Sequence, residues 1–352
     1  MIKDEKTRQA EHEFFAKPFQ MSYSGLNKLV FSPALFYKHY VLKQRDEEMS
    51  PALLNGKVIH CLLLDDGSFD KQFILLPGTM PSDTVKKVIH AVYQQGQDAE
   101  EKALSSDLNA YRDSILSTMV DMKFYQNLTD DKKADKDGVK RTGDEKRLDK
   151  IIMDSTQEYF EFLFLKGERD VVDIPTMEYC AEIVELLRAD EKIMYMLGMG
   201  DVPEHVQSMN EIMVDSSAEG FPFGIRGILD NVKINHEEKV IYVNDLKTTS
   251  KSIADFPETV DFWNLWLQAA MYKKLVTQEF LINNELDPSE WKIEFAFIVV
   301  DKYKQVYPFK ISDETMINWE LQLEVKMNEA KWHFENQRFD LPYIYATTEV
   351  KL

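Results

Sequence analysis

The residues with the clearest chemical potential lie between Gly227 and Thr249, in two short runs with the alternating apolar pattern of β-strands. Each run places an acidic side chain on an otherwise apolar face, formed by Ile228, Asp230, Val232 and Ile234 in the first run and by Ile241, Val243, Asp245 and Lys247 in the second. If the runs pair as a hairpin across the turn at residues 235–238, Asp230 and Asp245 lie near one another across the ladder. A register shift of one residue would separate the two faces.

Two carboxylates and a lysine on an apolar sheet face are costly to bury, and the carboxylates repel unless a cation lies between them. Their hard oxygen atoms suit Mg²⁺, with Mn²⁺ as a substitute. A lysine two residues after Asp245 can orient or polarise a metal-bound water, or stabilise a charged transition state. Phosphodiester hydrolysis needs these groups. The simpler alternative is a salt bridge between Asp245 and Lys247 at a strand end, because Asp-x-Lys alone is a common tripeptide.

A glycine and a histidine favour the catalytic interpretation. Gly56 and His60 are four residues apart, on one face of a predicted helix. The glycine permits another backbone to approach closely, and the histidine can ligate a metal. Taken alone, a histidine in such a helix is more often a hydrogen-bonded core residue.

Three more polar residues are candidates for supporting roles. Gln268 and Tyr272 are also four residues apart, on the helix that follows the Asp-x-Lys strand, where they could contact the DNA backbone or brace the site. The alternative is a semi-buried amphipathic helix. Glu211, on the strand before the hairpin, is either a further acid of the site or a surface residue.

The elements that must position these side chains change in type along the chain. Helices are predicted from Ser22 or Ser24, from Pro33, from Pro51, over 84–126, from about Leu148 to Phe164 and over 176–197, with a short strand at 73–76. Strands are then predicted at 206–215, 221–234, 240–248, 291–300 and 303–311, and helices at 257–280 and 314–337.

This order predicts a mixed α/β fold, in which a central mixed β-sheet is flanked by helices. We expect a mainly helical section over residues 1–200 and a core over 201–352, together forming one compact unit. Residues 129–150 are dense in charge and nearly free of apolar side chains, so they form either a solvated loop or the exposed start of a helix.

Composition excludes several classes of protein. The 352 residues carry 42 basic and 61 acidic side chains, and this net charge of −19 excludes blanket electrostatic binding to nucleic acid or anionic membrane, although not a local positive surface. Two cysteines, Cys61 and Cys180, cannot supply a disulfide scaffold or a four-cysteine zinc or iron–sulfur site. Because there is no apolar signal core and no run of ~18 apolar residues, we expect a soluble cytoplasmic protein without a membrane partner.

Taken in order, these stretches resemble the PD-(D/E)XK nuclease superfamily, and most closely its RecE-type 5′→3′ exonuclease branch of phages and prophages, which is related to lambda exonuclease and the RecB nuclease domain. The motifs that carry the resemblance are Ser22-Tyr-Ser-Gly-Leu with Ser32-Pro33, Gly56 to His60, Phe69 to Pro77, Gly227 to Asp230, Asp245-Leu246-Lys247-Thr248 and Gln268 to Tyr272. Aspartate at 245 replaces the glutamate of many superfamily members. Residues 80–150 and 281–352 match only in general pattern.

The resemblance implies a restriction-endonuclease-like core with a helical N-terminal section. His60, Asp230 and Asp245 would bind the metal, with the carbonyl of Leu246, and Lys247 would be the catalytic lysine. The supporting or substrate-binding residues would be Gln268, Tyr272, Glu211, Arg226, Thr248 and Ser24. Since the site cannot account for nineteen negative charges, we expect an acidic exterior around a small positive channel lined by Lys247 and Arg226.

The function that follows is a Mg²⁺-dependent DNA exonuclease, acting 5′→3′ on linear duplex in phage-type recombination and repair, in the host bacterial cytoplasm if phage-encoded. Its expected partners are duplex DNA ends, a single-strand annealing protein and further copies of the chain, since relatives form rings. No iron–sulfur cluster is expected. The alternatives are a single-strand or structure-specific nuclease on the same core, or a catalytically idle acidic protein that binds or mimics DNA.

Overall fold

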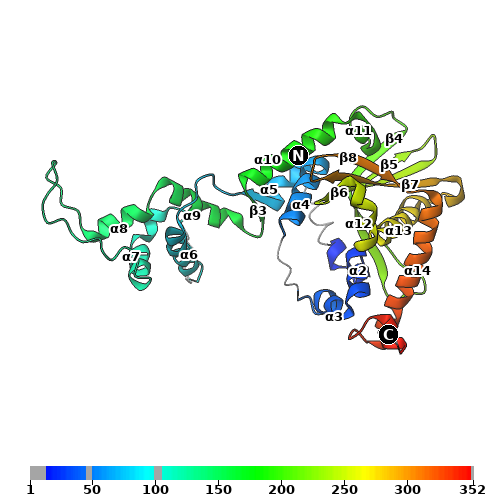
Figure 1. Cartoon of the computed structure of the whole chain (residues 1–352), viewed down its shortest axis with the longest axis horizontal. Coiled ribbons are helices and arrows are strands. Elements are labelled where there is room, and N and C mark those ends of the chain that lie inside the picture. Colours follow the sequence, from blue (N-terminus) through cyan, green and yellow to red (C-terminus); the bar gives the residue numbers. More distant parts are fainter. Residues whose placement is uncertain (1–12, 45–49, 99–104, 350–352) are drawn as a thin grey trace. The chain divides into compact units, whose positions relative to one another are not determined.

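The computed structural model describes residues 13–44, 50–98 and 105–349, which form two compact units (Figure 1). Unit 1 contains the described residues up to Phe69 and from Glu178 onward, and unit 2 is Asp70–Met177. Unit 2 is therefore inserted in unit 1, which differs from the expected boundary at residue 200. No helix in the described part of the chain is both long and apolar enough to cross a membrane.

Unit 1 is built on a mixed sheet of six strands, which confirms the predicted mixed α/β class. The strands follow the order β1-β5-β6-β7-β8, and β4 also pairs with β5. The pairs β4–β5, β5–β6 and β7–β8 are antiparallel, whereas β1–β5 and β6–β7 are parallel. Their bounds are Gln20–Met21 (β1), Val206–Ser216 (β4), Gly224–Asn235 (β5), Val240–Thr249 (β6), Lys292–Asp301 (β7) and Val306–Lys310 (β8).

The register of β5 and β6 agrees with the predicted hairpin. Val232 pairs with Val243 and Ile234 pairs with Ile241, so the alternating faces match. The last pair of this ladder is Asn231 with Asn244. Beyond it β5 continues along β4 and meets β1 at Gly224, so β5 and β6 stop pairing with each other at Asp230 and Asp245.

One face of the sheet packs on α13, Leu265–Val276, which contacts β5 and β7 and is backed by α14, Asp313–Asn336. The buried apolar residues of this layer include Val232, Val243, Phe295 and Phe297 from the sheet. The same cluster receives residues of α2 (Tyr23–Phe31), α3 (Pro33–Phe36) and α12 (Phe256–Phe262). Figure 1 shows α12, α13 and α14 together beside the strands.

The opposite face is covered by α4, Pro51–Leu64, and α11, Glu191–Leu197. A row of three asparagines, Asn210, Asn231 and Asn244, crosses β4, β5 and β6 on this face. Asn231 Nδ2 donates to Leu197 O at 2.9 Å and Asn244 Nδ2 donates to Met196 O at 2.9 Å. The row therefore satisfies carbonyls at the C-terminal end of α11, and it ties that helix to the sheet.

Hydroxyl caps fix where the predicted helices begin. Ser22, Ser32 and Ser50 each accept a backbone N–H at the start of α2, α3 and α4, and Pro33 and Pro51 occupy first-turn positions. Four of the predicted helices are divided. Those over 84–126 and 148–164 give Asp83–Asp98 with Arg112–Asp121 and Gly143–Ile151 with Asp154–Lys166, and the other two divide as follows. Asp190 caps α11 and ends α10 (Ile174–Ala189), and Trp263-Asn264 separates α12 from α13.

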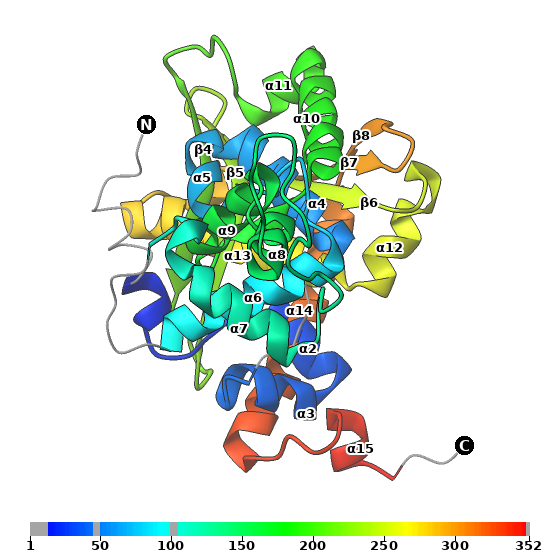
Figure 2. The same cartoon turned by 90° about the vertical axis from the view of Figure 1, so that its left-hand side faces the viewer.

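Unit 2 is a small helical unit with a parallel two-stranded sheet, β2 (Phe73–Leu75) with β3 (Asp170–Val172). Its helices enclose a separate apolar core that includes Ile89, Ile115 and Phe160. Contacts join α6 to α7 and α9, and α7 to α8, as seen in Figure 2. The helices are α6 (Asp83–Asp98), α7 (Arg112–Asp121), α8 (Gly143–Ile151) and α9 (Asp154–Lys166).

The charged segment over 129–150 divides between the two predicted forms. Residues 129–142 form a looped-back turn, in which Asp131 N donates to Arg141 O and Asp135 N donates to Val139 O, both at 2.9 Å. Thr142 and Glu145 then form a capping box that begins α8. The first half is thus a solvated loop and the second half is helix.

Candidate functional site

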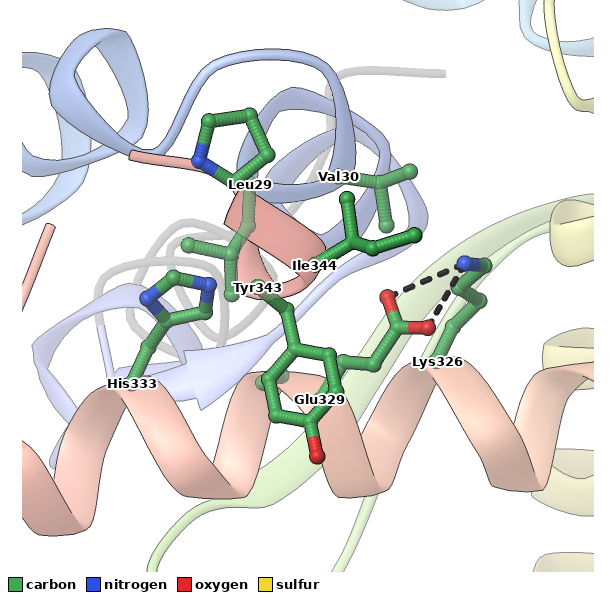
Figure 3. Close-up of a pocket in the computed structure, with 9 residues that line it drawn as sticks. Leu29, Val30, Lys326, Glu329, His333, Tyr343 and Ile344 are labelled. Atoms are coloured by element: carbon green, nitrogen blue, oxygen red, sulfur yellow. Dashed lines mark hydrogen bonds and ion pairs between the residues drawn. The ribbon is translucent and has the colours of Figure 1, made fainter. Parts of the chain in front are cut away.

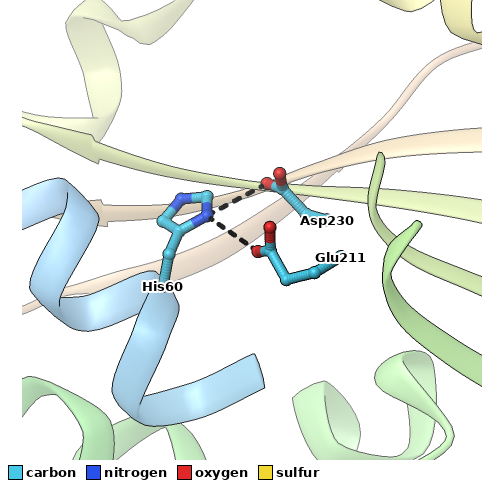
Figure 4. A group of neighbouring side chains, drawn as sticks. All are labelled: His60, Glu211 and Asp230. Atoms are coloured by element: carbon cyan, nitrogen blue, oxygen red, sulfur yellow. Dashed lines mark ion pairs between the residues drawn. The ribbon is translucent and has the colours of Figure 1, made fainter. Parts of the chain in front are cut away.

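Three potential metal ligands converge where β5 and β6 stop pairing. His60 comes from α4, Glu211 from β4 and Asp230 from β5, and one ligand atom of each lies within 4.8 Å of the others (Figure 4). His60 Nδ1 is 3.8 Å from Glu211 Oε1 and 3.6 Å from Asp230 Oδ2. One imidazole and two carboxylates are a donor set that suits a divalent cation of the Mg²⁺ and Mn²⁺ type.

The backbone N–H and carbonyl of Leu246 hold two of these ligands in place. His60 Nε2 donates to Leu246 O at 2.9 Å, and Leu246 N donates to Asp230 Oδ2 at 2.7 Å. Because Nε2 is engaged, His60 presents Nδ1 to the two carboxylates. The Leu246 carbonyl, predicted as a metal ligand, is here the acceptor that orients His60.

Glu211 has a backbone conformation that side-chain-bearing residues seldom adopt. Its φ is 50°, although the register of β4 and β5 is the same on both sides of it, at Asn210–Asn231 and at Ile212–Leu229. Glu211 Oε1 is buried and receives no hydrogen bond from the described residues. A strained backbone and an unsatisfied buried carboxylate oxygen in one residue are typical of a ligand-binding position.

Asp245 and Lys247 form a buried ion pair beside this cluster. Asp245 is 0% exposed, and its Oδ1 accepts a hydrogen bond from Gln268 Nε2 at 2.7 Å. Its Oδ2 lies 2.6 Å from Lys247 Nζ, without the angle of a hydrogen bond. Asp245 is not one of the three convergent side chains, whereas Glu211, which the resemblance gave a supporting role, is one of them.

The charges of the site shift the pKa values of His60, Asp245 and Lys247. Burial disfavours the charged form of His60, but the charges of Asp230 and Glu211 outweigh burial and raise its pKa to about 9. Burial also raises the pKa of Asp245, to about 6, and the charge of Asp230 adds to this while Lys247 opposes it. Burial opposes the charged form of Lys247, yet Asp245 and Asp230 together raise its pKa. Lys247 is therefore a fixed cation.

Helix α13 supports the site from the face of the sheet opposite to the one covered by α4. Gln268 holds Asp245, and the Tyr272 hydroxyl donates to Ile228 O at 2.8 Å. A Cβ on Gly227 would lie 2.8 Å from Tyr272 Cε1 and 3.1 Å from Leu275 Cδ1, so only glycine lets the ring seat against β5. The predicted Gly227-x-x-Asp230 spacing thus has a packing reason.

Three other predicted residues lie outside the convergent cluster, on β6, β5 and α2. Thr248 faces α4, since its Oγ1 lies 3.4 Å from where a Cβ on Gly56 would be. The Arg226 guanidinium lies 5.3 Å from the centre of the Phe15 ring. Ser24 accepts a hydrogen bond from the Tyr40 hydroxyl at 3.1 Å, within the N-terminal helices.

Tyr23 also contacts the surroundings of the site, although its sequence position did not predict this. Its hydroxyl donates to Trp263 O at 2.8 Å, and burial together with the nearby charge of Asp245 raises its pKa. A tyrosine between two serines carries no spacing signal that would have singled it out.

A separate cavity lies among α2, α14 and α15 (Tyr343–Thr347) and has a volume of about 180 Å³. Figure 3 shows its lining, in which Lys326 and Glu329 form an ion pair at 2.8 Å. His333 also lines it, and His333 Nδ1 is 2.5 Å from Arg338 O. None of the site residues described above lines this cavity.

Comparison with known proteins gives a similarity at the level of structure and none at the level of sequence. No protein-family profile matches the sequence, and no curated protein sequence matches it. Among solved structures, the chain is similar to a crystal structure from Eubacterium rectale named "Putative exonuclease", with a TM-score of 0.46 and 12% sequence identity, over 100% of this chain and 95% of that one.

Proposed function

We propose that this chain is a divalent-cation-dependent nuclease that hydrolyses phosphodiester bonds in DNA. The observation that carries the proposal is the convergence of His60, Glu211 and Asp230 beside the buried Asp245–Lys247 pair. Glu211 Oε1 supports cation binding, because it is buried and its ion pair with His60 Nδ1 at 3.8 Å leaves it without a hydrogen bond, which is costly.

In this proposal His60 Nδ1, Glu211 and Asp230 hold Mg²⁺ or Mn²⁺. Such a cation would polarise the phosphodiester as a Lewis acid and lower the pKa of a coordinated water. Asp245, which adjoins these ligands, is held through Gln268 and contributes negative charge to the same place.

Lys247 acts as an electrostatic group and not as a base. Its ammonium is kept protonated by two carboxylates and is 23% exposed at its side chain, so it can meet an anionic phosphate. A fixed positive charge there would stabilise the charge that develops on the phosphate oxygens. Gln268 and Tyr272 hold Asp245 and β5, and thereby keep the ammonium in position.

We further propose an exonuclease that acts 5′→3′ on linear duplex, working with a single-strand annealing protein and as a homo-oligomer. The ordered motifs from Ser22 to Tyr272 support this part through the resemblance. The net charge of −19 is compatible with it, because the cation and Lys247 can provide positive charge at the site alone.

The substrate is tested with three DNA forms: linear duplex, covalently closed circular duplex and single strand, each incubated with Mg²⁺ or Mn²⁺. Digestion of linear duplex with release of nucleotides from 5′ ends is the expected result. Cleavage of closed circles would contradict the exonuclease assignment, and digestion of single strand alone would favour the single-strand nuclease. If neither cation supports cleavage of any form, the idle DNA-binding or DNA-mimic protein becomes the better account.

A further inference from the structure

Two neighbouring aromatic side chains, Phe262 and Trp263, stand out on the surface at the turn between α12 and α13. They are 71% and 57% exposed, and their rings meet edge to face with centroids 4.8 Å apart. Single exposed apolar residues need no explanation, but two large adjacent rings leave a substantial apolar area in water. Such area is typical of a surface that is covered during binding.

The backbone that carries the rings is held firmly. Trp263 O accepts hydrogen bonds from the Tyr23 hydroxyl at 2.8 Å and from Asn27 Nδ2 at 3.1 Å. Asn264 follows in the left-handed region with φ 51°, and its Nδ2 donates to Asn27 Oδ1 at 2.8 Å. The rings are thus presented on a fixed turn, and a bound group would have little backbone motion to suppress.

This turn belongs to the candidate active site. Gln268, which donates to Asp245, is the fourth residue of α13, and α13 begins two residues after Trp263. Tyr23 lies between the turn and Asp245. Its hydroxyl donates to Trp263 O, and the nearby charge of Asp245 contributes to its raised pKa. The aromatic pair and the Asp245–Lys247 pair are therefore neighbours around the start of α13.

We propose that Phe262 and Trp263 form a stacking platform for a nucleobase next to the phosphodiester that is cleaved. This rests on the proposed function and names its substrate contact. A nucleobase fits because it has a flat apolar face and is covalently linked to the phosphate that the cation and Lys247 would receive. Stacking on the platform would also add affinity for DNA without requiring positive charge. This matters because the net charge of the chain is −19.

The test is a double-mutant cycle between the protein and its DNA, measured by fluorescence anisotropy with Mg²⁺ in a Lys247→Ala background. The DNA is a labelled duplex with a short single-stranded end, and a single abasic nucleotide is moved along the three terminal positions. Trp263→Ala should weaken binding of the intact DNA roughly 5- to 150-fold, and Trp263→Phe should restore most of the loss. Tyr345→Ala, a matched change at an exposed aromatic residue, should have no effect.

The cycle separates stacking from a general loss of structure. At one abasic position the unmodified Trp263 protein should lose the same factor, and Trp263→Ala should then cause no further loss. An equal effect of Trp263→Ala on intact DNA and on every abasic DNA would overturn the platform. A concentration-dependent dimer that Trp263→Ala disrupts, with unchanged DNA affinity, would overturn it in favour of a second copy of the chain.

The outcomes also distinguish this inference from the proposed function. If the native protein cleaves DNA with Mg²⁺ but the cycle is additive, the nuclease stands and the platform fails. If the native protein neither binds nor cleaves DNA, both fail.

Discussion

Asp230 Oδ2 accepts a hydrogen bond from the backbone N–H of Leu246 at 2.7 Å, just beyond Asn231 and Asn244, the last paired residues of β5 and β6. A side chain thus provides the acceptor where the strands no longer pair. The same oxygen lies 3.6 Å from His60 Nδ1. The end of the ladder and the convergence of ligands are therefore one structural feature.

Asp230 has two separable roles, as a hydrogen-bond acceptor and as a charged ligand. Asp230→Asn keeps an acceptor for Leu246 N–H, so its free energy of unfolding should lie within about 1 kcal/mol of that of the native protein. Asp230→Ala leaves that N–H unsatisfied and should cost about 1–3 kcal/mol. Both should lose cation binding, measured by calorimetry with Mn²⁺, while urea unfolding in chelator gives the stabilities. Equal destabilisation by the two changes would contradict the hydrogen-bond role.

Glu211 should matter for cation affinity through its charge. Glu211→Gln is nearly isosteric, and it should weaken Mn²⁺ binding by at least about tenfold in a calorimetric titration. Glu219→Gln, at an exposed position in the turn after the same strand, is the matched control and should change the affinity little. Equal affinities for the native protein and Glu211→Gln would remove Glu211 from the site.

The left-handed backbone of Glu211 lowers the stability of the protein, while its carboxylate is needed for cation binding in our proposal. With φ at 50°, replacement by glycine removes a steric cost of about 1 kcal/mol. Glu211→Gly should therefore unfold at a higher urea concentration than Glu211→Ala, although neither variant binds the cation. A glycine variant less stable than the alanine variant would argue that the conformation is not strained.

The raised pKa of His60 predicts how stability depends on pH in the presence of a chelator. Its folded-state pKa of about 9 exceeds the ordinary value of 6.5, so the folded protein binds more protons between these limits. The stabilisation is complete below pH 6.5 and is lost as the pH rises through about 9. His60→Gln should reduce this decrease in the free energy of unfolding with rising pH. Saturating Mn²⁺ should also reduce it, because a ligating imidazole is deprotonated. A stability that rises over this range because of His60 would contradict the assignment.

Gly227 should tolerate no larger residue. In Gly227→Ala the added Cβ would meet Tyr272 Cε1 at 2.8 Å, so the helix or the strand must shift, at a cost of about 1–3 kcal/mol. Gly78→Ala is the control, because its Cβ would meet its nearest neighbour at 3.5 Å, an ordinary contact. Thermal unfolding measures both, and equal midpoints would show that the packing of Tyr272 is not tight.

Local patterns predicted much of the fold. The serine and proline signals at Ser22, Pro33 and Pro51 predicted helix starts correctly, since capping depends on residues near in sequence. Strand alternation left the register of β5 and β6 open but predicted which residues share a face, and the observed pairs Val232–Val243 and Ile234–Ile241 match those faces. The breaks at Asp190 and Asn264 were not predicted, because the apolar pattern continues across both.

The arrangement of the site depended on contacts between distant segments. Spacing alone put Asp230 and Asp245 near one another across the hairpin, and the observed ladder ends at Asn231 and Asn244, the residues next to them. It could not show that Glu211 has a left-handed backbone. Nor could it show that the backbone of Leu246 forms hydrogen bonds with both His60 and Asp230. The inserted unit Asp70–Met177 was also missed, because contacts within unit 1 join segments on both sides of it.

In our proposal, hydrolysis of DNA at this site depends on a divalent cation and on Lys247. Its most direct test is the rate of nucleotide release from labelled linear duplex with Mg²⁺, comparing the native protein, Lys247→Ala and the exposed control Lys251→Ala. We predict that chelator abolishes the activity, that Lys247→Ala lowers the rate by at least about 100-fold and that Lys251→Ala leaves it nearly unchanged. Cleavage that persists in chelator, or an equal rate for Lys247→Ala, would contradict the account.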